Sequence, residues 1–201
     1  MTNMTVDAAT IERITDRLAT AQWGDFRLPK APLVIVGHHG CGKDTVAQII
    51  CSLTNKTYLG SLSFMVAPHL YGLFKELGVV GNSVGFDAFY TNRHNYSGYI
   101  QHTLNTIRGH HPEYVLSAAR EAEIITGVRT LDEIELLAGQ MATFIWVNRE
   151  VEDDPTLEYR AVDILDYCDS VDYIQNNGDL WDLVRNIASS DIVRRFAKVE
   201  V

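Results

Sequence analysis

Residues 33–45, LVIVGHHGCGKDT, join an apolar run to a glycine-spaced loop that ends in Gly-Lys. Gly37 closes the apolar run, and four residues separate it from Gly42 and Lys43. This spacing allows successive backbone N–H groups to curl around an anion, with the N-terminus of a following helix behind them. The lysine of such a loop reaches the β- and γ-phosphates of a nucleotide. The pattern therefore predicts a loop that binds nucleotide phosphates.

The residues after the lysine concern the metal that accompanies a nucleotide. The position that is usually Ser or Thr is Asp44, and Thr45 follows it. Oxygen ligands suit Mg²⁺, so we expect Asp44 or Thr45 to hold this ion directly or through water. ATP and Mg²⁺ are thus the expected cofactors. The expected binding residues are Gly37, His38, His39, Gly40, Cys41, Gly42, Lys43, Asp44 and Thr45.

Four arginines are candidates for contacts with phosphate groups. Arg129 follows the apolar run IITGV and Arg149 follows TFIWVN, so both are expected at the carboxyl edge of a sheet, where ligands of open α/β folds bind. With Lys43, they are the predicted catalytic residues, because phosphoryl transfer requires positioning and positive charge. Arg93 and Arg108 lie in polar stretches between strands, where they either clamp an acceptor phosphate or are solvated.

The histidines and cysteines do not predict a metal centre or a disulfide framework. None of the adjacent histidine pairs has the i, i+4 spacing that places two ligands on one helix face. His38 and His39 either line the nucleotide entrance or are exposed. The three cysteines have no paired spacing.

These residues must be positioned by alternating strands and helices. Short apolar runs predict strands at 33–37, 57–61, 123–128, 143–147 and 171–175, and helical patterns occupy 7–20, 44–53, parts of 64–120, 131–138 and 180–194. The alternation predicts a three-layer α/β domain with a mostly parallel five-stranded sheet flanked by helices. Residues 1–32 are expected to form an N-terminal helix and a connector, Trp23 to Pro32, and 33–201 the domain, with 62–122 as a substrate-side insertion.

Charge and hydropathy limit the partners of the protein. The formal net charge is −9, whereas proteins that grip long nucleic acid usually carry a basic face. A small nucleotide is therefore the favoured substrate, although a basic cleft on an acidic body keeps DNA open as one. No segment is long and apolar enough to span a bilayer, and no basic signal start is visible. We expect a cytoplasmic protein, and homodimer formation is left open.

Four ordered blocks of the sequence resemble the phage-type deoxynucleoside monophosphate kinases, a branch of the P-loop nucleotide kinases. They are GHHGCGKDT, SLSFMVAPHLYGLF, IITGVRTLDEIELL and DYIQNNGDLWDLV, and they cover most of residues 33–187. The resemblance implies a P-loop NTPase-like fold, a phosphotransferase activity and, for a phage-encoded chain, the host cytoplasm. Arg129 and Glu133 match the third block of the family. Where the family carries an aspartate before Val-Arg, this chain has Gly127, so the role of that aspartate falls to Asp44 or is lost.

Three functions remain open at this point. The first is an ATP-dependent kinase that phosphorylates a deoxynucleoside monophosphate. The second is a related kinase that phosphorylates the 5-hydroxymethyl group of a modified pyrimidine, such as hydroxymethyluracil, in phage DNA. A hydroxyl acceptor requires a general base, and Asp87 or Glu133 would then serve at the substrate. The third is a non-catalytic nucleotide-binding protein.

Overall fold

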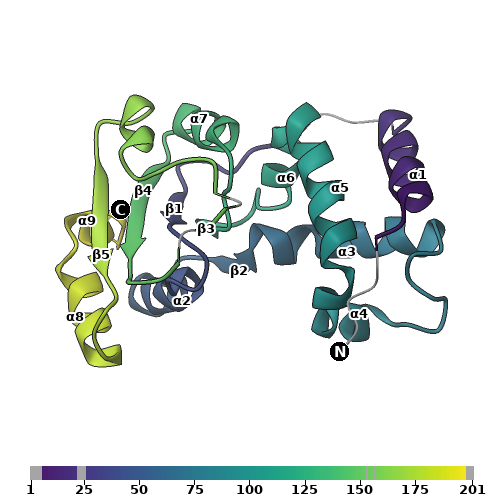
Figure 1. Cartoon of the computed structure of the whole chain (residues 1–201). Coiled ribbons are helices and arrows are strands. Elements are labelled where there is room, and N and C mark those ends of the chain that lie inside the picture. Colours follow the sequence, from purple (N-terminus) through teal and green to yellow (C-terminus); the bar gives the residue numbers. More distant parts are fainter. Residues whose placement is uncertain (1–5, 22–25, 153, 156, 198–201) are drawn as a thin grey trace.

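The computed structural model describes residues 6–21, 26–152, 154–155 and 157–197 of the 201-residue chain. Its centre is one sheet (Figure 1) formed by β1 (Leu33–Val36), β2 (Tyr58–Ser61), β3 (Ile124–Thr126), β4 (Thr143–Asn148) and β5 (Val171–Gln175). The strands lie in the order β2-β3-β1-β4-β5, and every neighbouring pair among them is parallel. The predicted five-stranded α/β sheet is confirmed, and its described strands are all parallel.

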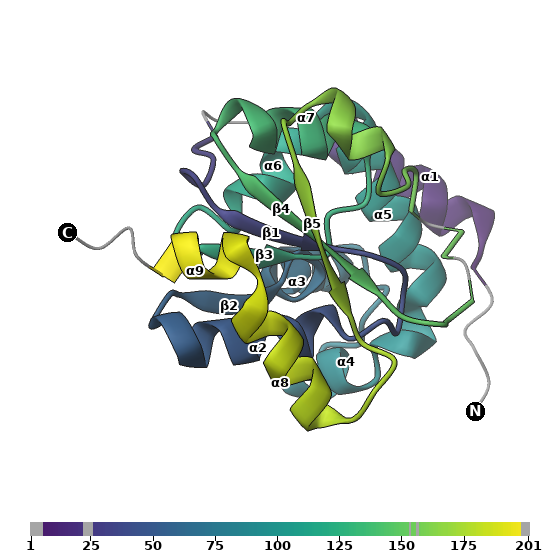
Figure 2. The same ribbon diagram turned by 90° about the vertical axis from the view of Figure 1, so that its left-hand side faces the viewer.

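Helices cover both faces of the sheet, so the predicted three layers are also confirmed (Figure 2). One face carries α2 (Lys43–Thr54), α8 (Leu180–Ser189) and α9 (Asp191–Ala197). The other face carries α6 (Pro112–Ser117) and α7 (Leu131–Gly139), and its apolar core extends into α3 (Leu62–Glu76) and α5 (Ser97–His110).

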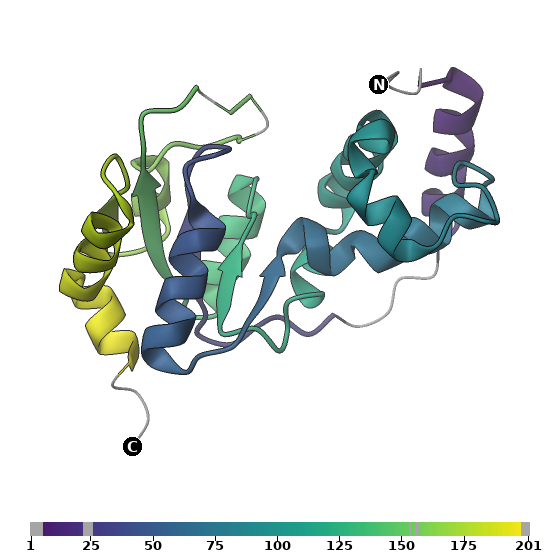
Figure 3. The same ribbon diagram turned by 90° about the horizontal axis from the view of Figure 1, so that it is seen from below.

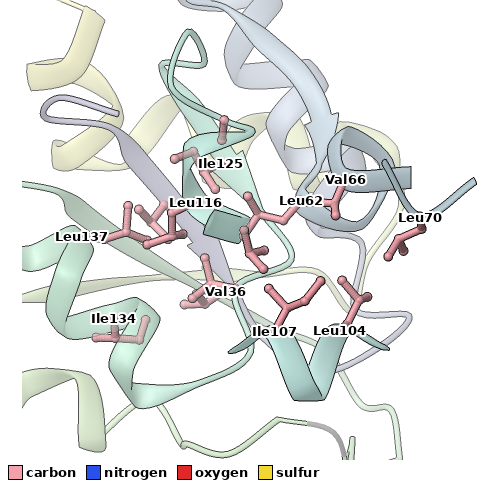
Figure 4. Close-up of a cluster of buried hydrophobic side chains, with 14 of the residues drawn as sticks. Val36, Leu62, Val66, Leu70, Leu104, Ile107, Leu116, Ile125, Ile134 and Leu137 are labelled. Carbon is pink, nitrogen blue, oxygen red and sulfur yellow. The ribbon is translucent and has the colours of Figure 1, made fainter. Parts of the chain in front are cut away.

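Two apolar cores lie between these layers because successive side chains of a strand point to opposite faces. In β1, Leu33 and Ile35 belong to the core beneath α2, whereas Val34 and Val36 belong to the core on the other face. Figure 4 shows part of this second core, to which the sheet and four helices contribute Val36, Ile125, Leu62, Val66, Leu70, Leu104, Ile107, Leu116, Ile134 and Leu137. All four residues of β1 are buried, which explains why the strand reads as an uninterrupted apolar run.

Residues 62–122 connect β2 to β3 almost entirely through helices. This segment contains α3, α5 and α6 together with α4 (Phe86–Thr91) and a 3₁₀ helix, η1 (Arg93–Tyr96). Helix α1 (Ala8–Ala19) joins the group, since the Tyr99 hydroxyl of α5 donates to Asp7 Oδ2 at 2.8 Å. Figures 1 and 3 show α1, α3, α4 and α5 together on one side of the sheet. The helices predicted across 64–120 are confirmed, and their role on the substrate side stays a prediction.

Two predicted boundaries were wrong. The predicted helix 180–194 is divided into α8 and α9 at Ser190, whose backbone is extended and whose hydroxyl accepts from the N–H of Val193 at 3.2 Å. The predicted strand 123–128 ends at Thr126 because Gly127 adopts φ +87°, a left-handed conformation that stops the ladder.

The remaining predictions on the fold concern the N-terminal region. The predicted helix at 7–20 is α1, whose N-cap Asp7 accepts from Thr10 N at 2.8 Å. Part of the predicted connector, residues 22–25, lies outside the described residues. Within the described ranges, no helix combines the length and the apolar character needed to cross a membrane.

The strand order places a topological switch point at the carboxyl ends of β1 and β4, which are neighbours. The chain leaves β1 toward the β2 edge and leaves β4 toward the β5 edge, so the two connections diverge. Open α/β sheets bind ligands at such a switch point. The glycine loop therefore lies where the topology favours a ligand.

Candidate functional site

The glycine loop 37–42 links β1 to α2 and requires glycine at two close approaches. A Cβ on Gly37 would lie 2.7 Å from Val147 O of β4 and 2.9 Å from Cys41 Sγ. A Cβ on Gly42 would lie 2.4 Å from Asn176 Nδ2, and its φ of +94° also favours glycine. Gly42 is the N-cap of α2 and makes no side-chain cap hydrogen bond. The first backbone N–H groups of α2 therefore remain available to an anion, as in phosphate-binding helix N-termini.

Lys43 folds back across this loop. Its Nζ donates to Gly37 O at 2.7 Å and to His38 O at 2.6 Å, and it lies 3.7 Å from Cys41 Sγ. Burial lowers the pKa of Lys43, and the positive charge of Arg129 lowers it further. The ammonium is thus held inside the loop by carbonyl oxygens, and bound phosphates would offer it stronger, charged acceptors.

Two predicted arginines converge on the loop from the ends of β3 and β4, the strands on either side of β1. Arg129 lies three residues after β3, and its guanidinium pairs with Asp154 in the segment that follows β4. The backbone N–H of Asp154 in turn donates to His38 Nδ1 at 3.2 Å. Arg149, directly after β4, places Nη1 3.5 Å from Gly40 O. The structure therefore brings Lys43, Arg129 and Arg149 together, as the strand-end positions predict.

The acidic segment after β4 also supports Arg129 through its backbone. Glu158 N donates to Arg129 O at 3.0 Å, and the Tyr159 hydroxyl donates to Val128 O at 3.0 Å. Tyr159 is buried, which raises the pKa of its phenol well above the usual range. This segment lies within residues 148–160, NREVEDDPTLEYR, and residues 153 and 156 are outside the described residues. Its described part is thus anchored against the strand end that carries Arg129.

Asp44 lies in the first turn of α2, where its carboxylate is exposed and contacts strands β2 and β3. Its Oδ1 accepts from the Tyr58 hydroxyl of β2 at 2.7 Å and from Thr126 Oγ1 of β3 at 2.8 Å. Burial raises the pKa of Tyr58, and its hydrogen bond to Asp44 raises it further. The neighbouring Thr45 is exposed. Asp44 is therefore fixed beside the loop, in a position that suits an oxygen ligand.

Gly127 stands where the resembling family carries an aspartate, and the structure leaves little space there for a side chain. Asp44 is then the carboxylate predicted to hold the metal. A Cβ on Gly127 would lie 3.2 Å from Leu62 N, at the start of α3, in addition to the strain of its positive φ. Among the residues that the structure describes, no group of three or more His, Cys, Asp or Glu side chains is arranged to hold a metal. A site with one carboxylate still fits Mg²⁺, which usually takes one or two carboxylates, substrate phosphates and several waters.

Two predicted substrate residues, Arg108 and Glu133, instead form a buried pair. Arg108 Nε donates to Glu133 Oε1 at 2.8 Å, and the Glu133 side chain is fully buried. The other oxygen, Oε2, accepts from Arg129 N at 2.7 Å and from Thr130 N at 3.3 Å. Thr130 and Glu133 make the capping box of α7. In this arrangement Arg108 and Glu133 support the backbone at Arg129, and both Glu133 oxygens are engaged.

The other two predicted substrate residues lie on the helical segment. Asp87 is exposed in the first turn of α4, and Arg93 places its guanidinium carbon 4.4 Å from the Tyr90 ring centroid. Tyr90 meets Phe64 edge to face at 5.0 Å and stacks on Phe86 at 6.1 Å. Tyr90 is also near enough to Tyr58 to raise the pKa of that phenol. The aromatic cluster of Phe64, Phe86 and Tyr90 therefore lies on the Asp44 side of the loop.

Four residues of the site were not predicted in their roles. Asn176 Nδ2 donates to Cys41 O at 2.7 Å, so the turn after β5 holds the back of the loop. The Asn-Asn-Gly sequence at 176–178 is typical of a turn, and Asp179, which follows it, caps α8. Tyr58, Thr126 and Asp154 carry no local signal, because their contacts depend on how the strands are arranged.

The exposed parts of the loop include His39 and Gly40, whereas Cys41 is fully buried and its pKa is raised by that burial. No protein-family model, no curated protein and no solved structure matches this chain. The site must therefore be interpreted from its own geometry. Its consistent feature is a set of cations and backbone N–H groups around a glycine loop at the switch point of a parallel sheet.

Proposed function

We propose that this protein is an ATP-dependent P-loop phosphotransferase that transfers the γ-phosphate to a deoxynucleoside monophosphate. The observation that carries the proposal is the convergence of Lys43, Arg129 and Arg149 on the glycine loop. Lys43 and the loop N–H groups hold the donor phosphates. Arg129, assisted by Arg149, neutralises charge on the transferred group, because phosphoryl transfer depends mainly on positioning and electrostatic stabilisation.

Magnesium would be held on the Asp44 side of the loop, with Thr45 as the neighbouring hydroxyl. When bound, the ion would offset the negative charge of the donor phosphates. The chain's own part is to present an oriented carboxylate at the N-terminus of α2, next to the Lys43 ammonium. The fixed position of Asp44 supports this assignment.

A phosphate acceptor is favoured over a hydroxyl acceptor. A hydroxyl on a modified pyrimidine requires a general base. Of the two predicted bases, Glu133 is fully buried with both oxygens hydrogen-bonded, and Asp87 is exposed on α4. A monophosphate acceptor requires cations and a surface for its base. Arg93 and the aromatic cluster of Phe64, Phe86 and Tyr90 suit those needs, and the resemblance to deoxynucleoside monophosphate kinases agrees.

A turnover assay separates the three functions. Purified protein is incubated with ATP and Mg²⁺ and, in parallel, with each deoxynucleoside monophosphate, with hydroxymethyluracil-containing DNA or with no acceptor. We expect ADP and a deoxynucleoside diphosphate in at least one monophosphate reaction, identified by chromatography and mass spectrometry. Phosphorylated DNA alone would identify the base-modifying activity instead. Nucleotide binding without ADP formation in any reaction would identify a non-catalytic protein.

A further inference from the structure

We propose that Tyr58 and Thr126 are positioning residues that fix the Asp44 carboxylate for magnesium, an inference that rests on the proposed function. The two hydroxyl groups come from β2 and β3, and their oxygens lie 3.1 Å apart. Both donate to the same atom, Asp44 Oδ1, at 2.7 Å from Tyr58 and 2.8 Å from Thr126. Two donors from different strands hold a carboxylate in one orientation, whereas one donor would leave it free to turn.

Both hydroxyl groups bind Asp44 Oδ1, and this leaves Asp44 Oδ2 for a metal. Within the described residues, Asp44 Oδ2 accepts no hydrogen bond, and the side chain is exposed at the first turn of α2. Carboxylates that bind metals are themselves hydrogen-bonded, and these outer partners affect metal affinity strongly. An arrangement with Oδ1 engaged and Oδ2 open therefore suits a carboxylate that contacts Mg²⁺ through one oxygen.

The positions of Asp44 and Thr126 also differ from the usual arrangement of carboxylate and hydroxyl groups around a phosphate loop. In P-loop NTPases, the residue after the lysine supplies a hydroxyl, and an aspartate outside the loop supplies the carboxylate. Here Asp44 follows Lys43, and the hydroxyl of Thr126 lies at the end of β3. The next residue, Gly127, has no space for a side chain without moving the start of α3. In this chain, then, the carboxylate follows the lysine and a hydroxyl lies at the end of β3, and the two groups are hydrogen-bonded to each other.

A merely structural role would connect α2 to β2 and β3 without any effect on the metal. The two roles differ in what they predict for a chain that remains folded. A structural contact changes the melting temperature alone. A positioning contact changes the affinity of the protein–ADP complex for a divalent cation, while the affinity for metal-free ADP stays the same.

The test measures Mn²⁺ binding to the protein–ADP complex by electron paramagnetic resonance, with Mn²⁺ as a probe for the magnesium site. ADP affinity in EDTA and the melting temperature are measured alongside. We expect Tyr58→Phe and Thr126→Val each to weaken Mn²⁺ binding roughly 10- to 100-fold, the usual range for outer partners of metal ligands. Asp44→Asn should weaken it at least as much, and Thr126→Ser, which keeps the hydroxyl, should behave as the wild type.

Tyr71→Phe is the matched control, because the Tyr71 hydroxyl also makes one strong hydrogen bond, to Val84 O at 2.7 Å, but on the helical segment. It should leave Mn²⁺ binding unchanged. The proposal is overturned if Tyr58→Phe and Thr126→Val bind ADP and Mn²⁺ as the wild type does, even with lowered melting temperatures. A wild-type protein that binds no ADP in EDTA or with metal would instead overturn the proposed function itself.

Discussion

Lys43→Ala is expected to lower phosphoryl transfer by roughly 10²-fold or more while leaving the fold intact. Among the residues that the structure describes, the ammonium makes its contacts with the glycine loop, through Gly37 O, His38 O and Cys41 Sγ, and Lys43 takes no part in either apolar core. Loss of one preorganised charge-stabilising contact typically costs roughly 10²- to 10³-fold in kcat. Turnover of ATP measures the effect, and circular dichroism checks the fold.

Lys56→Ala provides a control for loss of a lysine. Lys56 pairs with Glu123 at 3.2 Å and precedes β2, so it lies at the amino end of the strands, away from the loop. This variant should keep wild-type turnover. Activity of Lys43→Ala close to that of the wild type would contradict the phosphate-loop assignment.

Arg129→Ala is expected to lower kcat far more than it lowers ADP affinity. Arginines that stabilise the transferred phosphoryl group contribute about 10³- to 10⁵-fold to kcat, and we expect a loss of about 10³-fold here. Arg129 also pairs with Asp154, so its removal takes a guanidinium away from a nearly buried carboxylate. Stability must therefore be measured with activity, by chemical denaturation.

The variant Asp154→Asn separates the two effects of the Arg129 substitution. It weakens the same ion pair but keeps the guanidinium, so a loss caused by destabilisation would appear in both variants. We expect a large loss of kcat only for Arg129→Ala. If Arg129→Ala instead loses ADP affinity and keeps its turnover per bound complex, Arg129 holds the donor nucleotide and its proposed role is wrong.

Most of the fold could be predicted because its signals are local. The apolar run of β1 is buried on both faces, and the glycine spacing after it requires a tight loop, so strand, loop and helix follow from adjacent residues. The alternation of strands with helices then requires parallel pairing. The errors at 127–128 and at Ser190 have one origin, since a backbone conformation ended an element whose apolar pattern continued.

In the candidate site, the sequence predicts the positions of residues that directly follow a strand, and it does not predict contacts between distant elements. Arg129 and Arg149 follow strands, so the parallel sheet brings both to the loop. The sequence does not show that Glu133 turns inward to meet Arg108, because a capping residue and an exposed acid look alike in a helix start. The contacts of Tyr58 and Thr126 with Asp44 depend on the strand order, which no local pattern specifies.

The most direct test of the central claim is calorimetric titration of the wild-type protein and of Lys43→Ala with ADP. The claim is that residues 37–45 hold nucleotide phosphates. It predicts saturable binding to the wild-type protein, displacement of ADP by ATP, and loss of most of the affinity in the folded Lys43→Ala protein. Absence of ADP binding to the wild-type protein, or equal binding to both proteins, would contradict it.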